Sequence, residues 1–389
     1  MTRRRHVPWW LVAVAVSALA VLSGALPADD ARALAERTLP VLVFVAALTV
    51  VAEMCAGAGL FDAAASLASR VARGHRWALW GLVVVLATVS TAVLSLDTTA
   101  VLLTPVVIAL ARRTHTPPLP FALAVLALAN TASLVLPVSN LTNLLADHTL
   151  RAAHVGYLGL MWAPALAAIV VTVAVLAVRD RRALHGRYDL HPPRPVRDRV
   201  LLAVCAVVVA ALGIAFVVGA PTARTAVAAA VVLLAATLLR HQKLPVPARD
   251  LVPWRTLLVV LGLFVVVETA HAHGLGSLLA QAAGTGSTAG DLLRLAAVGA
   301  AASNAINNLP AYLALEPATA AEPLRVAALL IGTGVGPLVT PWGSLATVLW
   351  WQRCRVVLLD VQARTIVRQG LLLAPLAVVA ATLALVAAG

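Results

Sequence analysis

The sequence predicts an all-α polytopic membrane protein with about nine full spans and two re-entrant hairpins. Hydrophobic residues occupy 61% of its 389 positions and charged residues only 12%, and the mean hydropathy is +0.95. These values are typical of helical integral membrane proteins. The apolar runs reach the length of a spanning helix, whereas the strands of a membrane barrel would be short and alternating.

Nine apolar runs are long enough to cross a membrane as full spans. We expect them at residues 8–27, 40–58, 119–147, 156–178, 199–219, 223–240, 256–272, 321–352 and 369–388. Two further runs, 77–112 and 291–316, are interrupted midway by polar residues. The interruptions predict re-entrant hairpins, whose two arms enter and leave the membrane on the same side.

The distribution of positive charge supports this path when the N-terminus lies in the cytoplasm. Of the 29 Lys and Arg residues, 23 then face the cytoplasm, which agrees with the positive-inside rule. The six that remain outside are Arg32, Arg37, Arg151, Arg224, Arg294 and Arg325. We therefore expect a multi-pass protein of the bacterial inner or plasma membrane with a cytoplasmic N-terminus.

A basic segment, residues 179–199, divides the chain into two halves with the same order of elements. Each half contains a hairpin and then a broken span: 77–112 and 119–147 in the first repeat (1–178), 291–316 and 321–352 in the second repeat (200–389). The two hairpins open to opposite sides in the charge-based topology, so we expect inverted repeats. We interpret the basic segment as a cytoplasmic linker, with a docking surface for a cytoplasmic partner as the alternative.

The two broken spans carry matching polar interruptions. PVSNLTNLL at Pro137–Leu145 aligns with PWGSLATVL at Pro341–Leu349 at a constant offset of 204. Such residues are costly in hydrocarbon because lipid satisfies neither their polar groups nor the backbone groups that proline frees. Their repetition in register predicts helix breaks around a central polar pocket. The expected breaks are Pro137, Gly336, Pro337, Pro341 and Gly343.

Asp97 is the strongest single candidate for a functional residue. It lies at the tip of the first hairpin (SLDTT, Ser95–Thr99). A carboxylate within a membrane is costly unless it is paired, protonated or near water, so it indicates a role in substrate or ion coupling. The alternative is a structural partner for an arginine or for backbone amides at a helix start. The second tip, SNAINNLP (Ser303–Pro310), is rich in asparagine, which indicates a lined cavity or, alternatively, a hydrogen-bonded knot between helices.

The predicted substrate- and ion-binding set surrounds this one acid with hydroxyl and amide groups. At the tips it contains Asp97, Thr98, Thr99, Ser303, Asn304, Asn307 and Asn308. In the broken spans it contains Asn130, Thr131, Ser133, Ser139, Asn140, Thr142, Asn143, Thr333, Thr340, Ser344 and Thr347. Serine and threonine often bond back to their own helix, so each is a weak signal alone and only the repeated set is strong.

Three further groups are secondary candidates. Glu53 and Glu268 match each other in the two halves and are either structural or protonatable. His271 and His273 lie at a helix end, where solvated histidines are ordinary and a proton relay is the alternative. Cys55 is interpreted as a small apolar residue, with a metalloid-binding thiol as the alternative.

Motif content excludes several function classes. A single lysine, Lys243, leaves no GxxxxGK[ST] loop for ATP hydrolysis. The three cysteines are scattered without a CxxC pair, which argues against a zinc site or a disulfide framework. Neither an HExxH motif nor a nucleophile-and-base pair is present. We therefore expect no enzymatic activity, no metal or other cofactor, and no nucleic-acid partner despite the net charge of +13.

Four segments resemble the arsenite efflux permeases of the ArsB type, in the ion-transporter superfamily that includes citrate and dicarboxylate carriers and NhaD-type antiporters. They are LDTTAVLLTPVVIALARR (Leu96–Arg113), NTASLVLPVSNLTNLLADH (Asn130–His148), SNAINNLPAYL (Ser303–Leu313) and GVGPLVTPWGSLATVLW (Gly334–Trp350). With their order and spacing they cover nearly the whole chain after the first span.

The resemblance implies export of a small inorganic substrate, arsenite or antimonite, driven by the proton motive force. It implies H⁺ as the coupling ion, with Na⁺ as the alternative. It also implies a scaffold with a moving transport domain, a homodimer and, for some such permeases, a cytoplasmic ATPase subunit. Two positions depart from the family pattern: Leu-Asp-Thr-Thr replaces the usual Asn-Asp-Gly at the first tip, and the second broken span lacks the acidic and lysine residues often found there.

The residue inventory independently suits an uncharged solute. Arsenite is largely an uncharged trihydroxide at neutral pH and needs hydroxyl and amide partners. Every arginine lies near a membrane face in the predicted topology, so a dicarboxylate would lack a cationic clamp and would be repelled by Asp97. A sodium/proton antiporter is compatible, since Asp97 with hydroxyls and carbonyls can exchange Na⁺ for H⁺. The alternative function is such an antiporter or a dicarboxylate-type anion permease.

Overall fold

The computed structural model describes residues 9–189 and 197–388. This part of the chain is helical and contains no strand, its one extended contact being an isolated bridge between His75 and Arg187. The first half forms α1 (Trp9–Leu22), α2 (Ala28–Gly57), α3 (Leu60–Val71), α4 (Arg76–Leu94), α5 (Leu96–Thr98), the π-helix η1 (Thr99–Leu103), α6 (Thr104–Arg113), α7 (Pro118–Thr131), the 3-10 turns η2 (Ala132–Val135) and η3 (Pro137–Ser139), α8 (Leu141–Ala152) and α9 (Tyr157–Asp180). The second half forms α10 (Arg199–Val217), α11 (Thr222–Leu239), α12 (Ala248–Leu251), α13 (Trp254–Ala272), α14 (Leu275–Ala283), α15 (Ala289–Ile306), α16 (Asn308–Leu315), η4 (Glu316–Thr319), α17 (Pro323–Val335), η5 (Gly336–Leu338), α18 (Leu345–Val356) and α19 (Ala363–Ala388).

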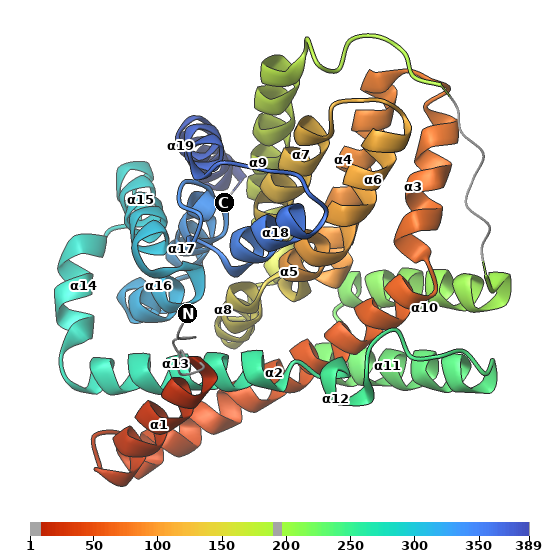
Figure 1. Ribbon diagram of the computed structural model, residues 1–389. Helices are drawn as coiled ribbons and strands as arrows, with labels where there is room; N and C mark the ends of the chain where they lie inside the picture. Colours follow the sequence, from red (N-terminus) through yellow and green to blue (C-terminus); the bar gives the residue numbers. More distant parts are fainter. Residues whose placement is uncertain (1–8, 190–196, 389) are drawn as a thin grey trace, which may run out of the picture.

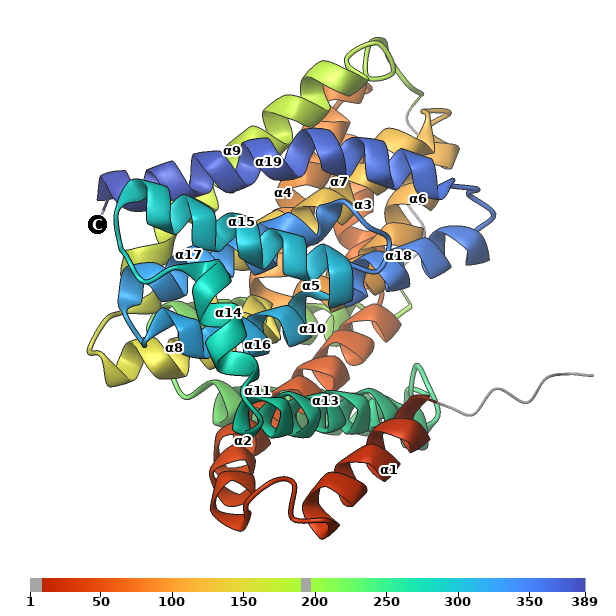
Figure 2. The same cartoon turned by 90° about the vertical axis from the view of Figure 1, so that its left-hand side faces the viewer.

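The helices are arranged in two layers. One layer, which we call the scaffold, consists of α1, α2, α10, α11 and α13, with α2 packed on α11 and α1 on α13 (Figure 2). The other layer, which we call the bundle, contains α4 to α9 and α15 to α19, and its largest internal contacts join α9 to α19 and α15 to α17 (Figure 1). The short helices α3 and α14 connect the layers on opposite sides of the molecule.

Eight helices are long and apolar enough to cross a membrane. They are Ala31–Gly57, Arg76–Leu94, Pro118–Val135, Tyr157–Leu184, Arg199–Val217, Thr222–Leu239, Ala248–Ala272 and Ala363–Ala388. Seven of them coincide with expected spans, and the eighth is α4, the first arm of the expected hairpin 77–112. Its 19 residues reach about 28 Å, close to the hydrocarbon thickness, so length alone does not separate a hairpin arm from a span.

Two expected full spans have no counterpart among these eight helices. Over the described part of 8–27, α1 contains 14 residues, about 21 Å of helix, which is less than a bilayer core of about 30 Å. Residue 8 lies outside the described residues. In 321–352 the apolar helix stops at Leu338, and the next helix begins only at Leu345. The run is therefore two half-helices because Gly336, Pro337 and Pro341 interrupt it.

Each hairpin turns at one residue with an unusual backbone. Ser95 separates α4 from α5 with φ 84° and ψ 160°, and Asn307 separates α15 from α16 with φ 99° and ψ 153°. Both side chains cap the helix that follows: the Thr98 amide donates to Ser95 Oγ at 3.4 Å, and the Leu309 amide donates to Asn307 Oδ1 at 3.4 Å. The polar residues at each tip thus end one arm and begin the next.

The broken helices are held open by close backbone packing. In the first, the chain is extended at Leu136 (φ −130°) and at Asn140 (φ −150°) on either side of η3. In the second, a Cβ added at Gly336 would lie 2.4 Å from the Cβ of Ala300 on α15. A Cβ at Gly343 would lie 2.6 Å from the carbonyl oxygen of Pro337. Glycine is therefore required at these two positions for the break to pack against the second hairpin.

Candidate functional site

A cavity of about 240 Å³ lies where the first hairpin tip and the first broken helix face the scaffold. Its bundle side carries Ser95, Asp97 and Thr98 from the tip and Asn140 from the break. Its scaffold side carries Phe44, Thr49 and Glu53 from α2, Thr256 from α13, and Pro253, which directly precedes α13. The cavity is therefore walled by both layers of the protein.

A second, larger cavity of about 690 Å³ adjoins the first and shares Asp97, Asn140 and Thr256 with it as lining residues. It extends to Asn307 and Asn308 at the second hairpin tip. Polar residues from the two halves of the chain, some 200 positions apart in sequence, thus border two adjoining cavities. Below, we call these two cavities together the Asp97 cavity.

Asp97 lies in the first turn of the helix that begins after Ser95. A helix start carries partial positive charge, which favours a carboxylate there. Within the described residues, no ion pair or side-chain hydrogen bond joins the Asp97 carboxylate to another group. The structure therefore offers no arginine partner for this acid and leaves it facing the hollow, where a proton, a cation or a solute can reach it.

Asn140 caps α8 and also borders both parts of the cavity. Its Oδ1 accepts from the Thr142 amide at 3.4 Å, while its buried Nδ2 has no partner among the described residues. A buried donor without a partner is uncommon in native structures and marks a place where a ligand or water binds. Asn140 therefore offers an amide donor to a solute beside Asp97.

The other amides of the first break hold the backbone. Asn143 Nδ2 donates to the carbonyls of Ser133 (2.6 Å) and Leu136 (3.2 Å), which the break would otherwise leave unpaired. Ser139 Oγ donates to the Ala92 carbonyl at 2.9 Å and ties the break to the first hairpin. Both side chains are fully buried and act as structural supports of the cavity wall.

Asn304 plays the corresponding part in the second break. Its Nδ2 donates to the Gly336 carbonyl at 2.8 Å, and its Oδ1 accepts from the Thr340 amide at 2.8 Å. Asn307 Nδ2 donates to the Trp342 carbonyl at 2.9 Å, and the Asn308 amide donates to the Gly343 carbonyl at 2.9 Å. The alternative interpretation of this asparagine-rich tip, a hydrogen-bonded knot, therefore describes Asn304, while Asn307 and Asn308 also border the cavity.

The predicted site residues separate into three groups. Those that border the cavity are Asp97, Thr98, Asn140, Asn307 and Asn308. Those that hold the breaks and tips are Thr99, Ser139, Thr142, Asn143, Asn304, Thr340, Ser344 and Thr347. Those that bond back within their own helix or turn are Asn130, Thr131, Ser133, Ser303 and Thr333. The side chains of the last group satisfy local carbonyls and line neither cavity.

Four polar or charged cavity residues from the scaffold, and Ser95 at the first tip, were not in the predicted set. Thr49, Glu53, Arg255 and Thr256 come from scaffold helices. The sequence signal for Glu53 was its match with Glu268, but neither was assigned to the pocket. The expectation that no arginine reaches the pocket is wrong for Arg255, because the first turn of α13 runs along the larger cavity. Its guanidinium also stacks 5.1 Å from the Trp254 ring.

The secondary candidates lie elsewhere. His271 Nε2 is 3.0 Å from the Ala314 carbonyl oxygen and His273 Nδ1 is 2.8 Å from that of Thr269. Cys55 is fully buried and lines neither part of the Asp97 cavity. Its burial favours the interpretation as a small apolar residue.

The chain is similar to known proteins at the levels of family, sequence and fold. The family model described as "Citrate transporter" (CitMHS) matches residues 1–336. The chain is 28% identical to an arsenical pump membrane protein of Yersinia enterocolitica over 358 residues, which covers 86% of this chain and 83% of that protein. An arsenical pump membrane protein of Escherichia coli is also 28% identical, over 325 residues, 78% of this chain and 76% of that protein.

The fold resembles that of the Alcanivorax borkumensis YdaH transporter, whose crystal structure was described as having an unusual topology. The TM-score is 0.59 at 17% sequence identity, with 97% of this chain and 98% of that chain covered. The resemblance to ArsB-type proteins that four sequence segments indicated is thus found along most of the chain. The protein is a polytopic membrane transporter, not an enzyme, and it belongs to the citrate transporter (CitMHS) family of the ion-transporter superfamily.

Proposed function

We propose that this protein exports arsenite or antimonite across the bacterial inner membrane and that the proton motive force drives the export. One observation carries the proposal: Asp97, an acid without a partner among the described residues, borders cavities whose other polar groups are mainly amides and hydroxyls. An uncharged trihydroxide both donates and accepts hydrogen bonds. Asn140 Nδ2 is a free donor for it, and the hydroxyls of Ser95 and Thr98 are nearby.

Asp97 supplies the coupling step in this proposal. When ionised it accepts a strong hydrogen bond from the solute, and when protonated it accepts that bond only weakly. A proton entering from the outer side would therefore release the solute there, and loss of the proton to the cytoplasm would restore the loading state. H⁺ is the proposed coupling ion, with no other cofactor; Na⁺ is the alternative.

The cavity suits loading from the cytoplasm in the proposed topology. Its scaffold wall contains Pro253, Arg255 and Thr256, which lie at the end of the basic segment 240–255 assigned to the cytoplasmic side or directly after it. We infer that the conformation described here is open toward the cytoplasm, with the N-terminus on the same side. An exporter must bind its solute from that side.

Two relatives within the superfamily give alternative functions. Arg255 on the wall of the larger cavity is the observation that favours a dicarboxylate-type anion permease, because a guanidinium pairs with carboxylates. Asp97 with the Ser95 and Thr98 hydroxyls favours a sodium/proton antiporter, since Na⁺ prefers oxygen ligands. Similarity to the arsenical pump membrane proteins supports the metalloid exporter over both.

A homodimer is the proposed assembly. The scaffold helices α10 and α11 expose apolar side chains, among them Val207 (68%) and Ile214 (66%), which lipid or a second copy would cover. A cytoplasmic ATPase subunit is a possible further partner, for which the basic linker after α9 is the available cytoplasmic segment.

The decisive experiment measures arsenite accumulation in a bacterial strain that lacks its own arsenite pump. Cells that express the protein should accumulate several-fold less arsenite than cells with an empty vector, and a protonophore should abolish the difference. Sodium tolerance and citrate uptake are measured in parallel in the same strain. Normal membrane levels of the protein with unchanged arsenite accumulation would refute the proposal, and a gain in sodium tolerance or citrate uptake would identify the alternative.

A further inference from the structure

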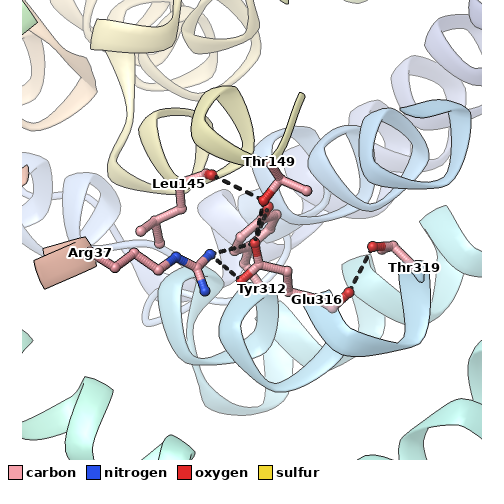
Figure 3. Close-up of polar contacts among 6 residues, drawn as sticks. All are labelled: Arg37, Leu145, Thr149, Tyr312, Glu316 and Thr319. Carbon is pink, nitrogen blue, oxygen red and sulfur yellow. Dashed lines mark hydrogen bonds and ion pairs between the residues drawn. The ribbon is translucent and has the colours of Figure 1, made fainter. Parts of the chain in front are cut away.

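An ion pair joins the scaffold to the bundle at one end of α2. Arg37 on α2 donates through Nη2 to both carboxylate oxygens of Glu316, at 2.5 and 2.6 Å. Glu316 begins η4, directly after the second arm of the second hairpin. Figure 3 shows the Arg37 side chain reaching out of α2 to this carboxylate. The contact therefore connects two elements that belong to different layers.

The Glu316 carboxylate is built into a small polar cluster. Its Oε1 accepts from Thr149 Oγ1 on α8 at 3.2 Å and from Tyr312 on α16 at 3.3 Å (Figure 3). The Glu316 side chain is 11% exposed, so the pair is shielded from water on most sides. α8 belongs to the first repeat and α16 to the second, so Glu316 gathers donors from both repeats and from the scaffold.

The cluster lies beside a hollow that adjoins the Asp97 cavity. Arg37 precedes Phe44 by seven residues, about two helical turns or 10 Å along α2. A separate hollow of about 550 Å³ on this side contains Arg37 in its wall. Phe44 and Leu144 line this hollow and also the Asp97 cavity. These two apolar side chains therefore separate the two hollows at the contact between α2 and α8.

We propose that Arg37 and Glu316 form a latch that holds the scaffold and the bundle together at the outer end, which keeps the path beyond Phe44 and Leu144 closed while the Asp97 cavity is open on the opposite side. The proposal rests on the proposed transport function, because it assigns the pair a role in alternating access. Any movement of the bundle along the scaffold must separate a residue of α2 from a residue of η4. The latch therefore adds a barrier to that movement and favours the state described here.

The geometry distinguishes this pair from other ion pairs of the protein. Arg151 and Asp147 are 2.7 Å apart, but both lie on α8, so the pair survives any rigid movement of the bundle. Arg240 and Asp198 are 2.9 Å apart within the scaffold. Only a pair that spans the layers changes in energy when the layers move, and only such a pair shifts the balance of conformations.

The test measures the accessibility of the Asp97 cavity from the cytoplasmic side. Val259 lines the larger cavity and is 37% exposed, so a Val259→Cys variant reports on its opening. The native cysteines Cys55, Cys205 and Cys354 are buried and give a low background. The labelling rate with a membrane-impermeant thiol reagent is measured in inside-out vesicles without substrate, in backgrounds carrying Arg37→Gln, Glu316→Gln or both.

We expect each single substitution to slow labelling several-fold, because loss of the latch shifts the population away from the cytoplasm-open state. The double variant should resemble either single variant, since both remove the same interaction. Arg37→Lys keeps the positive charge but loses the planar guanidinium group with its several donors. This variant should give an intermediate labelling rate. Asp147→Asn is the matched control, because it breaks an ion pair within one helix, and it should leave the rate within twofold of the parent.

Unchanged labelling in both single variants at normal membrane levels would overturn the proposal, as would additive effects in the double variant. If a glutamine variant fails to insert, Arg37→Lys and Thr149→Val, which removes one donor to Glu316, provide the same comparison. Because labelling needs no substrate, a negative arsenite assay leaves this test intact. Conversely, arsenite export with unchanged labelling would refute the proposed latch and still support the proposed transport function.

Discussion

Ser95 and Asn307 adopt nearly the same rare backbone conformation at the tips of the two hairpins. Their φ and ψ angles are 84° and 160° for Ser95, and 99° and 153° for Asn307, a region that is almost confined to glycine. Each side chain then caps the helix that follows, through an amide donor two or three residues further on. Both tips border the Asp97 cavity. Strain that recurs at matching positions beside one hollow indicates that each tip is shaped for the solute rather than for stability.

Replacement of Ser95 by glycine should therefore stabilise the protein. Glycine removes about 1 kcal/mol or more of backbone strain, while loss of the serine cap in favour of glycine costs only a few tenths. The melting temperature of the purified protein in detergent should rise. Ser66→Gly is the control, because Ser66 lies in the middle of α3, where glycine lowers stability by about 0.5 kcal/mol. Changes of the same sign in both variants would show that Ser95 is not strained.

Substitution of Asp97 by asparagine should abolish coupled transport and leave the fold intact. No partner among the described residues depends on its charge, so the variant leaves no buried arginine unpaired. Without a titratable group at the tip, proton-driven export should fall to background while the protein stays in the membrane at normal levels. The measurement is substrate export at several pH values, together with the melting temperature. Proton dependence like that of the parent would refute the coupling role.

Replacement of Asn143 by alanine should destabilise the protein much more than replacement of Thr131 by valine. Asn143 Nδ2 satisfies two carbonyls that the helix break leaves without partners, and each buried unpaired group costs about 1 to 3 kcal/mol. Thr131 Oγ1 bonds only to the Ala127 carbonyl, within its own helix. The melting temperatures of the two variants in detergent provide the comparison. An Asn143→Ala variant as stable as Thr131→Val would mean that the amide serves the solute instead of the break.

The tips and breaks were predictable because their cause is local. Several serine, asparagine, proline and glycine residues close together in an apolar run favour the end of a helix, whereas a single proline, as at Pro40 or Pro164, is accommodated within one. The turns at Ser95 and Asn307 and the interruption beside Pro137 follow from that rule. The inverted orientation of the two halves remains a prediction from charge placement.

The sequence could not show which polar residues border the cavity and which hold the backbone of the breaks. An asparagine amide can bind a solute or a backbone carbonyl equally well, and only the positions of the carbonyls show that Asn143 and Asn304 do the latter. The scaffold residues that line the cavity could not be predicted for another reason. Which helices face the tips depends on how the layers dock, so Thr49 and Thr256, ordinary threonines in apolar helices, carried no signal. The Arg37–Glu316 contact joins residues 279 positions apart, and the sequence could not predict it either.

Stability of the scaffold should depend on pH through Asp198, which caps α10 in the loop before it. Hydrogen bonds from the Arg240 guanidinium, and then from backbone amides including that of Leu201, hold the pKa of the Asp198 carboxyl below its ordinary value. A lowered folded-state pKa gives stability that is present above the unfolded value of about 3.9 and is lost as pH falls through the folded value. Asparagine caps a helix as well as aspartate does, so Asp198→Asn removes the charge alone. The variant should therefore melt below the parent at pH 7 in detergent, and the difference should shrink steadily as the pH is lowered below about 4. A difference that stays constant down to pH 3 would assign the effect to the shape of the cap instead of the ion pair.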